Sequence, residues 1–479
     1  MFFALKRRLR IKQTIFAVTI NVMTLIKSIS GIRGTIGGKE DESLTPIDVV
    51  KYTTAFADVI ITGENKRVVV GRDARLSGQM VNQLVCGTLI SKGIEVIDLD
   101  LSTTPTVEMA VVNENAAGGI ILTASHNPKQ WNALKLLNSK GEFLSGKEGE
   151  LILEIAESEG FDFSDVDSLG EITVNDAYMD IHIDEVLNLP LVDAEAVAKR
   201  KFKVVVDGVN SSGGIIIPKL LEQMGVECVK LYCEPNGHFP HNPEPLKEHL
   251  GDICKLVVEE KADFGIVVDP DVDRLAFISN DGEMFGEEYT LVACADYVLS
   301  KTPGNTVSNM SSSRALRDIT NKYNGSYQAS AVGEVNVVEL MKKTNAIIGG
   351  EGNGGIIYPE LHYGRDSLVG IALFLSHLAH EKKSVSALRD SYPKYTISKN
   401  KIELTPDINV DKVLADMAAK YAHEEVDTID GVKIYIAKEW VHLRKSNTEP
   451  IIRIYSESKD EQAADQLAKR IIEEIKACI

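Results

Sequence analysis

The residues with the clearest chemical meaning are three aspartates, Asp269, Asp271 and Asp273, which alternate along a short segment that ends at Arg274. Carboxylates this close repel one another unless a cation neutralises them, and Mg²⁺ prefers oxygen ligands of this kind. A calcium-binding EF-hand loop would need Gly in place of Arg274 and Glu in place of Asn280, so that interpretation fails. The segment predicts a magnesium site, and a solvated acidic loop is the alternative.

A second reactive segment reads Thr-Ala-Ser-His-Asn-Pro from Thr123 to Pro128. Ser125 follows an apolar run, so its hydroxyl can face a cleft at the end of a strand. His126 and Lys135 are near enough in sequence to handle a proton. No nucleophile-elbow motif surrounds the serine, and the segment is not a catalytic triad. Because Ser, Asn and Pro are common turn residues, an ordinary turn is the alternative.

Three further segments could hold an anion or a sugar. The first segment runs from Arg444 to Pro450, with Arg453 beyond it, and could bind a phosphate. It offers a guanidinium, two hydroxyls, an amide and backbone N–H groups, and the contributing side chains are Arg444, Ser446, Asn447 and Thr448. A polar hairpin tip is the competing interpretation. The glycine-rich run 349–355 permits close backbone approach to a ligand, and its Glu351 and Asn353 can bind hydroxyls. Arg33, between two glycines, suits an anion or a turn.

These segments follow a repeated pattern of a β-branched apolar strand, a loop rich in Gly or Asp, and a helical stretch. Such strands predict parallel sheets that are covered on both faces, with ligands at the carboxyl ends of the strands. The expected strands include 68–70, 119–122, 204–206, 266–268 and 347–348.

The last part of the chain differs and predicts a small α+β domain. Residues 433–436 and 451–455 read as strands, with 444–450 in the loop between them. A capping-box pattern at Ser458 and Glu461 predicts a closing helix with one apolar face. The segment 392–400, which contains Pro393, is the expected hinge before this domain.

Length and charge limit the class of protein. A chain of 479 residues exceeds one hydrophobic core, so three or four domains are expected. The net charge of -18 disfavours nucleic acid and anionic membranes as partners. Six scattered cysteines without a metal-binding spacing read as reduced thiols, which suits the cytoplasm. Residues 1–22 look foreign to the rest, and we expect translation to begin at Met23.

In this order along the chain, the segments resemble those of the α-D-phosphohexomutase superfamily, and the resemblance covers residues 27–479. It implies an α/β fold in which three repeated α/β domains with mixed or parallel sheets and a smaller C-terminal α+β domain surround a central cleft. We expect a phosphoserine domain at 23–178, a metal-binding domain at 179–282, a sugar-binding domain at 283–396 and a phosphate-binding domain at 397–479.

The resemblance also implies roles for individual residues. Ser125 would be the phosphoserine and, once phosphorylated, a ligand of Mg²⁺ together with Asp269, Asp271 and Asp273. Arg33, His126, Lys135 and Arg274 would line the reacting phosphoryl group, with Lys135 as a candidate general acid/base. The sugar would meet Glu351, Asn353 and Gly354, and its non-reacting phosphate would meet Arg444, Ser446, Asn447, Thr448 and Arg453. A hexose 1,6-bisphosphate would serve as intermediate and activator.

Two departures from the family pattern stand out. Many members carry a His where this chain has Gly355, so another group must do its work, and Ala133 stands where Gly is commoner. The form of the loops favours glucosamine phosphate as the substrate, with mannose or glucose phosphate as the alternative. A non-catalytic sugar-phosphate-binding protein is the alternative from another class. The expected partners are hexose phosphates, with a homodimer left open.

Overall fold

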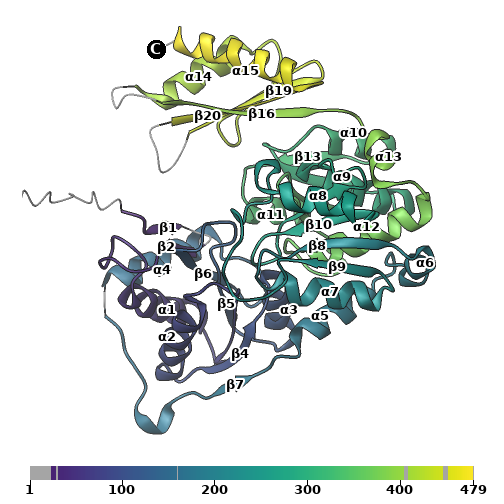
Figure 1. Ribbon diagram of the computed structural model, residues 1–479. Coiled ribbons are helices and arrows are strands. Elements are labelled where there is room, and N and C mark those ends of the chain that lie inside the picture. Colours follow the sequence, from purple (N-terminus) through teal and green to yellow (C-terminus); the bar gives the residue numbers. More distant parts are fainter. Residues whose placement is uncertain (1–22, 29–30, 159, 404–407, 446–450, 478–479) are drawn as a thin grey trace, which may run out of the picture.

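The computed structural model describes residues 23–477 except 29–30, 159, 404–407 and 446–450. Its four β-sheets follow one another along the chain, and the C-terminal sheet lies apart at the top of the view in Figure 1. Three sheets mix parallel and antiparallel strands, and the fourth is antiparallel. The predicted fold class is therefore confirmed. None of the helices in the described part of the chain combines the length and apolarity needed to cross a membrane.

The first sheet has the strand order β1-β2-β6-β5-β3-β4-β7. Its central strands are apolar on both faces because helices cover both sides; Ile120, Ile121 and Leu122, for example, are all buried. The strands are β1 (Ile26–Ser28), β2 (Gly31–Thr35), β3 (Arg67–Arg72), β4 (Glu95–Leu101), β5 (Gly118–Leu122), β6 (Trp131–Leu137) and β7 (Ile172–Val174). The helices are α1 (Pro46–Ile60), α2 (Gly78–Ser91), α3 (Thr104–Asn113) and α4 (Gly146–Ser158). Ala133 lies in β6 without a positive φ, so it is tolerated there.

The second sheet has the order β11-β10-β8-β9, in which β11 is the antiparallel strand. Its strands are β8 (Lys203–Asp207), β9 (Glu227–Leu231), β10 (Phe264–Val268) and β11 (Leu275–Ser279). The neighbouring helices are α5 (Tyr178–Leu187), α6 (Ala194–Arg200), α7 (Gly213–Gln223) and α8 (Gly251–Glu259). Because β8 and β10 are parallel neighbours, the loops that follow them leave the same edge of the sheet.

The third sheet has the order β13-β12-β14-β15 and shares one large apolar core with the second. Its strands are β12 (Asn305–Asn309), β13 (Tyr327–Ser330), β14 (Ala346–Glu351) and β15 (Gly355–Ile357). The helices of this part are α9 (Glu287–Lys301), α10 (Ala315–Lys322), α11 (Glu334–Thr344), α12 (Ser367–Glu381) and α13 (Val385–Asp390). Phe277 and Phe374 stack at 3.9 Å between ring centroids, which joins the two parts through their cores.

The C-terminal sheet is antiparallel, with the order β16-β20-β19-β18-β17. Its strands are β16 (Thr396–Glu403), β17 (Glu425–Asp427), β18 (Val432–Ile436), β19 (Glu439–Lys445) and β20 (Ile451–Ser458), and its helices are α14 (Val410–Lys420) and α15 (Glu461–Lys476). The apolar face of α15 packs on this sheet through Leu467, Ile471 and Ile475. The small α+β unit is confirmed.

Two sequence expectations for this unit are wrong. Arg444 lies in a strand, β19, and not in a loop: β19 pairs with β18 over residues 439–443 and with β20 over residues 440–445. The N-cap of α15 is Asp460, whose carboxylate accepts a hydrogen bond from Ala463 N at 2.8 Å. Ser458 instead ends β20, and its hydroxyl donates to Glu439 of the adjacent strand. The nearer carboxylate outcompetes the serine for the first free N–H groups of the helix.

Candidate active site

The predicted serine and the predicted metal ligands meet, although they are 144 residues apart in sequence. Ser125 follows β5, and the aspartate loop follows β10, so both loops leave the carboxyl ends of buried strands. The Ser125 hydroxyl donates to Asp269 Oδ2 at 2.6 Å, and its oxygen lies 3.4 Å from His126 Nδ1. This contact brings a nucleophilic hydroxyl to the edge of an acidic cluster.

A buried arginine that the sequence reasoning missed, Arg75, holds the serine loop. Its guanidinium donates from Nε to Asp73 Oδ2 at 2.9 Å, and its remaining N–H groups donate to backbone carbonyls of the loop. These acceptors are the carbonyl oxygens of Ser125, Asn127, Pro128 and Trp131. Asp73 also accepts from the hydroxyl of Thr123 at 2.6 Å. Four of the five guanidinium donors therefore bind the serine loop directly, and the fifth binds Asp73, which itself accepts from Thr123 of that loop.

Both reactive loops contain a residue in the left-handed backbone region. Ser125 has φ +47° and Val272 has φ +65°. A β-branched residue in this region is a genuine outlier, which persists only where the surrounding structure compels it. Val272 is fully buried between two of the aspartates. The packing thus holds both the hydroxyl and the carboxylates in orientations that a relaxed chain would not choose.

The three aspartates fit a divalent cation. Each offers a carboxylate oxygen within 4.8 Å of the others, and all three are buried. Asp271 Oδ1 and Asp273 Oδ1 have no hydrogen-bond partner among the described residues, so two buried oxygens are free to act as ligands. Burial and the charges of Asp271 and Asp273 raise the pKa of Asp269 well above its usual range. A bound cation would relieve that repulsion.

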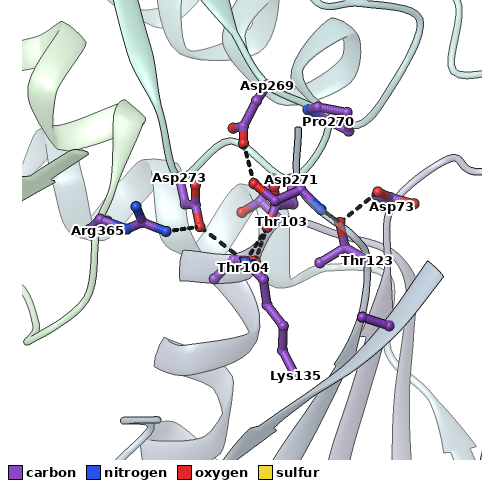
Figure 2. A network of polar contacts seen from close by, with 12 residues as sticks. Asp73, Thr103, Thr104, Thr123, Lys135, Asp269, Pro270, Asp271, Asp273 and Arg365 are labelled. Carbon is purple, nitrogen blue, oxygen red and sulfur yellow. Dashed lines mark hydrogen bonds and ion pairs between the residues drawn. The ribbon is translucent and has the colours of Figure 1, made fainter. Parts of the chain in front are cut away.

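Lys135 lies against the same cluster, as Figure 2 shows. Its ammonium donates to Asp271 Oδ2 at 2.6 Å and to Asp273 Oδ2 at 3.0 Å. Burial alone would lower the pKa of Lys135, but the charges of these two aspartates raise it. Thr104, at the start of α3, donates its hydroxyl to Asp271 Oδ2 at 2.6 Å and its backbone N–H to Asp271 O at 2.9 Å. A helix N-terminus therefore adds to the positive potential around the aspartates.

Two arginines, Arg33 and Arg274, and the imidazole of His126 lie beside the serine. All three line one cavity of about 710 Å³, together with Ser125 and Lys135. Burial and the charge of Arg274 lower the pKa of Arg33. Burial and the charge of Arg274 also lower the pKa of His126 to about 2, so its ring is neutral. An anion placed between the two arginines would be stabilised by both.

The glycine-rich run forms another wall of the cavity, where Glu351 and Asn353 lie. Glu351 accepts hydrogen bonds from Asn309 at 2.8 Å, from Gly333 N at 3.2 Å and from Arg365 at 2.9 Å. Gly354 has φ +86°, and a Cβ there would lie 1.9 Å from the backbone oxygen of Leu275, so only glycine fits.

The same run rests on Glu288 of α9. A Cβ at Gly352 would lie 2.0 Å from Glu288 Oε1, and the other carboxylate oxygen accepts from Ser313 N at 2.7 Å. Burial raises the pKa of Glu288 to about 8, so this carboxyl is protonated at neutral pH. The glycine-rich run 349–355 therefore packs against a neutral carboxylic acid, Glu288.

The predicted phosphate cradle is described only in part. Ser446, Asn447 and Thr448 lie outside the described residues. Arg444 on β19 and Arg453 on β20 are cross-strand neighbours, and neither is among the cavity-lining residues. Arg444 instead pairs with Asp430 at 2.9 Å between Nε and Oδ2, and this carboxylate accepts from Val332 N at 2.9 Å. Because Val332 lines the cavity, Arg444 is linked to it through one carboxylate.

Sequence reasoning missed several residues of the site, namely Asp73, Arg75, Thr104, Glu334 and Arg365. Glu334 and Arg365 line the cavity, and Arg365 reaches both the aspartate loop and Glu351. The one available signal was the Gly-Arg-Asp sequence at the end of β3, whose Asp73 lies two residues before Arg75. The others carry no local motif.

Comparison with known proteins gives the class of this chain. The sequence matches four families described as phosphoglucomutase/phosphomannomutase: alpha/beta/alpha domain I over residues 25–163, domain II over 180–282, domain III over 286–395 and the C-terminal domain over 401–474. The chain therefore belongs to the phosphoglucomutase/phosphomannomutase family, within the α-D-phosphohexomutase superfamily.

Individual relatives span almost the whole chain. A protein of Thermococcus kodakarensis named phosphoglucomutase/phosphomannomutase is 36% identical over 92% of this chain and 98% of its own length. A protein of Sulfurisphaera tokodaii named phosphoglucosamine/phosphogalactosamine mutase is 33% identical over 92% and 98%. The crystal structure of a phosphoglucomutase/phosphomannomutase family protein from Burkholderia thailandensis matches with a TM-score of 0.82 at 25% identity, covering 95% of this chain and 97% of that one.

Proposed function

We propose that this protein is a phosphohexomutase that interconverts hexose 6-phosphate and hexose 1-phosphate through phosphorylated Ser125 and a hexose 1,6-bisphosphate. One observation carries the proposal. Ser125 lines a cavity of about 710 Å³ together with Arg33 and Arg274, and its hydroxyl donates to Asp269 of the buried three-aspartate cluster. That volume suits a small ligand such as a sugar bisphosphate. A serine, an acidic cluster and paired arginines are the parts that phosphoryl transfer needs.

In the proposed reaction, a free sugar hydroxyl attacks the phosphorus of phosphoserine 125. The new bond to the sugar oxygen forms as the bond to the Ser125 oxygen breaks, while Arg33 and Arg274 bind the phosphoryl oxygens. Mg²⁺ held by the three aspartates would offset the charge on the departing serine oxygen. Lys135, held as an ammonium by two of them, supplies a proton to that oxygen, and the proton that the attacking sugar hydroxyl loses restores the lysine ammonium.

The bisphosphate then has to turn so that its other phosphoryl group reaches Ser125. We propose that Arg444, Ser446, Asn447, Thr448 and Arg453 hold whichever phosphate is not reacting. The link from Arg444 through Asp430 to the cavity residue Val332 supports this placement. The sugar ring would meet Glu351, Asn353 and Gly354 during both half-reactions.

We propose glucosamine phosphate as the preferred substrate. The relative from S. tokodaii that is named phosphoglucosamine/phosphogalactosamine mutase supports it. The relative from T. kodakarensis named phosphoglucomutase/phosphomannomutase supports the second candidate, an enzyme for mannose or glucose phosphate.

Turnover of glucosamine, mannose and glucose 6-phosphates should be measured in parallel, with Mg²⁺ and a trace of the matching 1,6-bisphosphate. We expect the highest kcat/KM for glucosamine 6-phosphate. A higher kcat/KM for mannose or glucose 6-phosphate would select the second candidate. If intact mass shows that Ser125 is phosphorylated and none of the three substrates is turned over, a non-catalytic sugar-phosphate-binding protein would be favoured.

A further inference from the structure

The Arg365 side chain joins three carboxylates that come from separate parts of the chain. Its guanidinium donates to Glu334 at 3.0 Å, to Glu351 at 2.9 Å and to Asp273 at 2.6 Å. Glu334 begins α11, Glu351 ends β14, and Asp273 belongs to the acidic cluster, where Figure 2 shows Arg365 pointing at it. All three carboxylates are buried, and Arg365 is the cation that they share.

The stem of Arg365 occupies the room that a side chain at position 355 would fill. A Cβ built on Gly355 would lie 2.4 Å from Arg365 Cδ and 3.0 Å from its Cγ. Gly355 does not have the positive φ that requires glycine elsewhere in this run. The backbone would therefore accept another residue here, and the closest contacts that oppose one are with Arg365, followed by Asn353 Oδ1 at 3.2 Å.

We propose that Arg365 is the positioning residue that stands in for the absent side chain at position 355. It fixes the sugar-contacting Glu351 relative to Asp273. Gly355 and Arg365 then form one matched pair, in which the glycine makes room for the arginine. The role in turnover rests on the phosphohexomutase function proposed above, whereas the spatial claim does not. Through this pair, the residue that meets the sugar and the residue that meets the metal move as one unit.

A double-mutant cycle on kcat/KM tests the pair, using Gly355→Ala, Arg365→Ala and the double variant. Displacing Arg365 moves Glu351, so Gly355→Ala alone should lower kcat/KM by about ten- to a hundredfold. In the Arg365→Ala background the same substitution should change kcat/KM by less than about twofold, because the space is then free. Gly87→Ala is the matched control, since nothing lies within 4 Å of a Cβ at that site. Equal losses in both backgrounds would overturn the proposal.

Arg365→Lys separates positioning from folding. A lysine has one nitrogen in place of the fork, so it cannot hold all three carboxylates, and we expect KM to rise and kcat to fall while phosphoserine content stays unchanged. The control is Arg389→Lys, because Arg389 supports the fold by donating to Phe285 O and stacking on Tyr289 outside the cavity. It should lower the thermal midpoint without changing KM. A wild-type KM and kcat in Arg365→Lys would contradict the positioning role.

The same double-mutant cycle can be measured on the thermal unfolding midpoint, which does not depend on a substrate. Gly355→Ala should lower the unfolding midpoint in the wild-type background and leave it nearly unchanged beside Arg365→Ala. If the wild-type protein turned over no hexose phosphate, the proposed function would fail while this cycle still tested the pair. An additive thermal cycle would refute the pair even in an active enzyme. If Arg365→Ala does not fold, the comparison of Gly355→Ala with Gly87→Ala decides, and equal midpoints overturn the pair.

Discussion

Replacing Arg75 by methionine should detach the serine loop from its support. The Arg75 side chain is fully buried, and its five donors reach Asp73 and four backbone carbonyls between Ser125 and Trp131. Methionine fills much of the same volume but donates nothing. The variant therefore leaves one buried carboxylate without its cation and four carbonyls without these donors.

The size of the effect follows from these contacts. Breaking a buried ion pair from one side typically destabilises by about 3–5 kcal/mol. The lost carbonyl contacts add to this, but not in proportion, since they share one guanidinium. A displacement of the Ser125 hydroxyl by about 1 Å would lower turnover by about a hundredfold. Both effects should therefore appear together, with the larger fractional change in kcat.

Three measurements test this: the thermal midpoint, the phosphorylated fraction by intact mass, and kcat. Arg75→Lys should fall between wild type and Arg75→Met, because lysine keeps the charge but has only three donors on one nitrogen. Arg67→Met is the control, since Arg67 is half-exposed and its pair with Glu95 is a surface contact worth little. A soluble Arg75→Met protein with wild-type kcat and midpoint would refute the reasoning.

Four further predictions follow from the site. Ser125→Ala should abolish both the phosphorylated mass fraction and turnover; activity within about tenfold of wild type would rule out a phosphoserine. Chelation should stop the reaction, Mg²⁺ should restore it, and Asp271→Asn should lower kcat by at least about a hundredfold, so turnover that survives chelation contradicts the metal site. Arg444→Ala should raise KM and lower kcat, with a combined loss of about ten- to a hundredfold, while Ser125 still becomes phosphorylated; unchanged kinetics would leave Arg444 a structural residue. The pKa of Glu288 is about 8 in the folded protein and 4.5 in the unfolded chain, so its contribution to stability is lost as pH rises from about 4.5 to about 8. Glutamine cannot ionise, so the thermal midpoint of Glu288→Gln should rise relative to that of the wild type as pH increases from about 5 to about 8.

The parts of the site that could be predicted from sequence are those whose chemistry is local. Asp269, Asp271 and Asp273 are spaced so closely that their repulsion can be inferred without a structure. Ser125 lies three residues after the end of the apolar strand β5, at the carboxyl end of the sheet, as that position in the sequence suggests. The function of these residues can be predicted from the sequence of their own segment alone.

Arg75 and Arg365 could not be found in the same way. Arg75 acts on carbonyl groups that every residue carries, about fifty positions away, so no pattern of side chains marks it. Arg365 acts on carboxylates that only the fold brings together. The strand β19 was missed for a related reason: charged residues at both ends of 439–445 obscure an apolar stretch that is buried between two partners. In each case the tertiary neighbour, and not the local sequence, decides.

The hydrogen bond from Ser125 to Asp269 has a consequence for refolding. It joins two sheets across 144 residues, so it cannot form until both have folded and docked. Contacts of such long sequence separation form slowly, because loop-closure entropy must be overcome first. During renaturation from denaturant, helical circular dichroism should therefore recover ahead of enzymatic activity. The interval between the two signals would measure the docking of finished domains rather than the folding of either one.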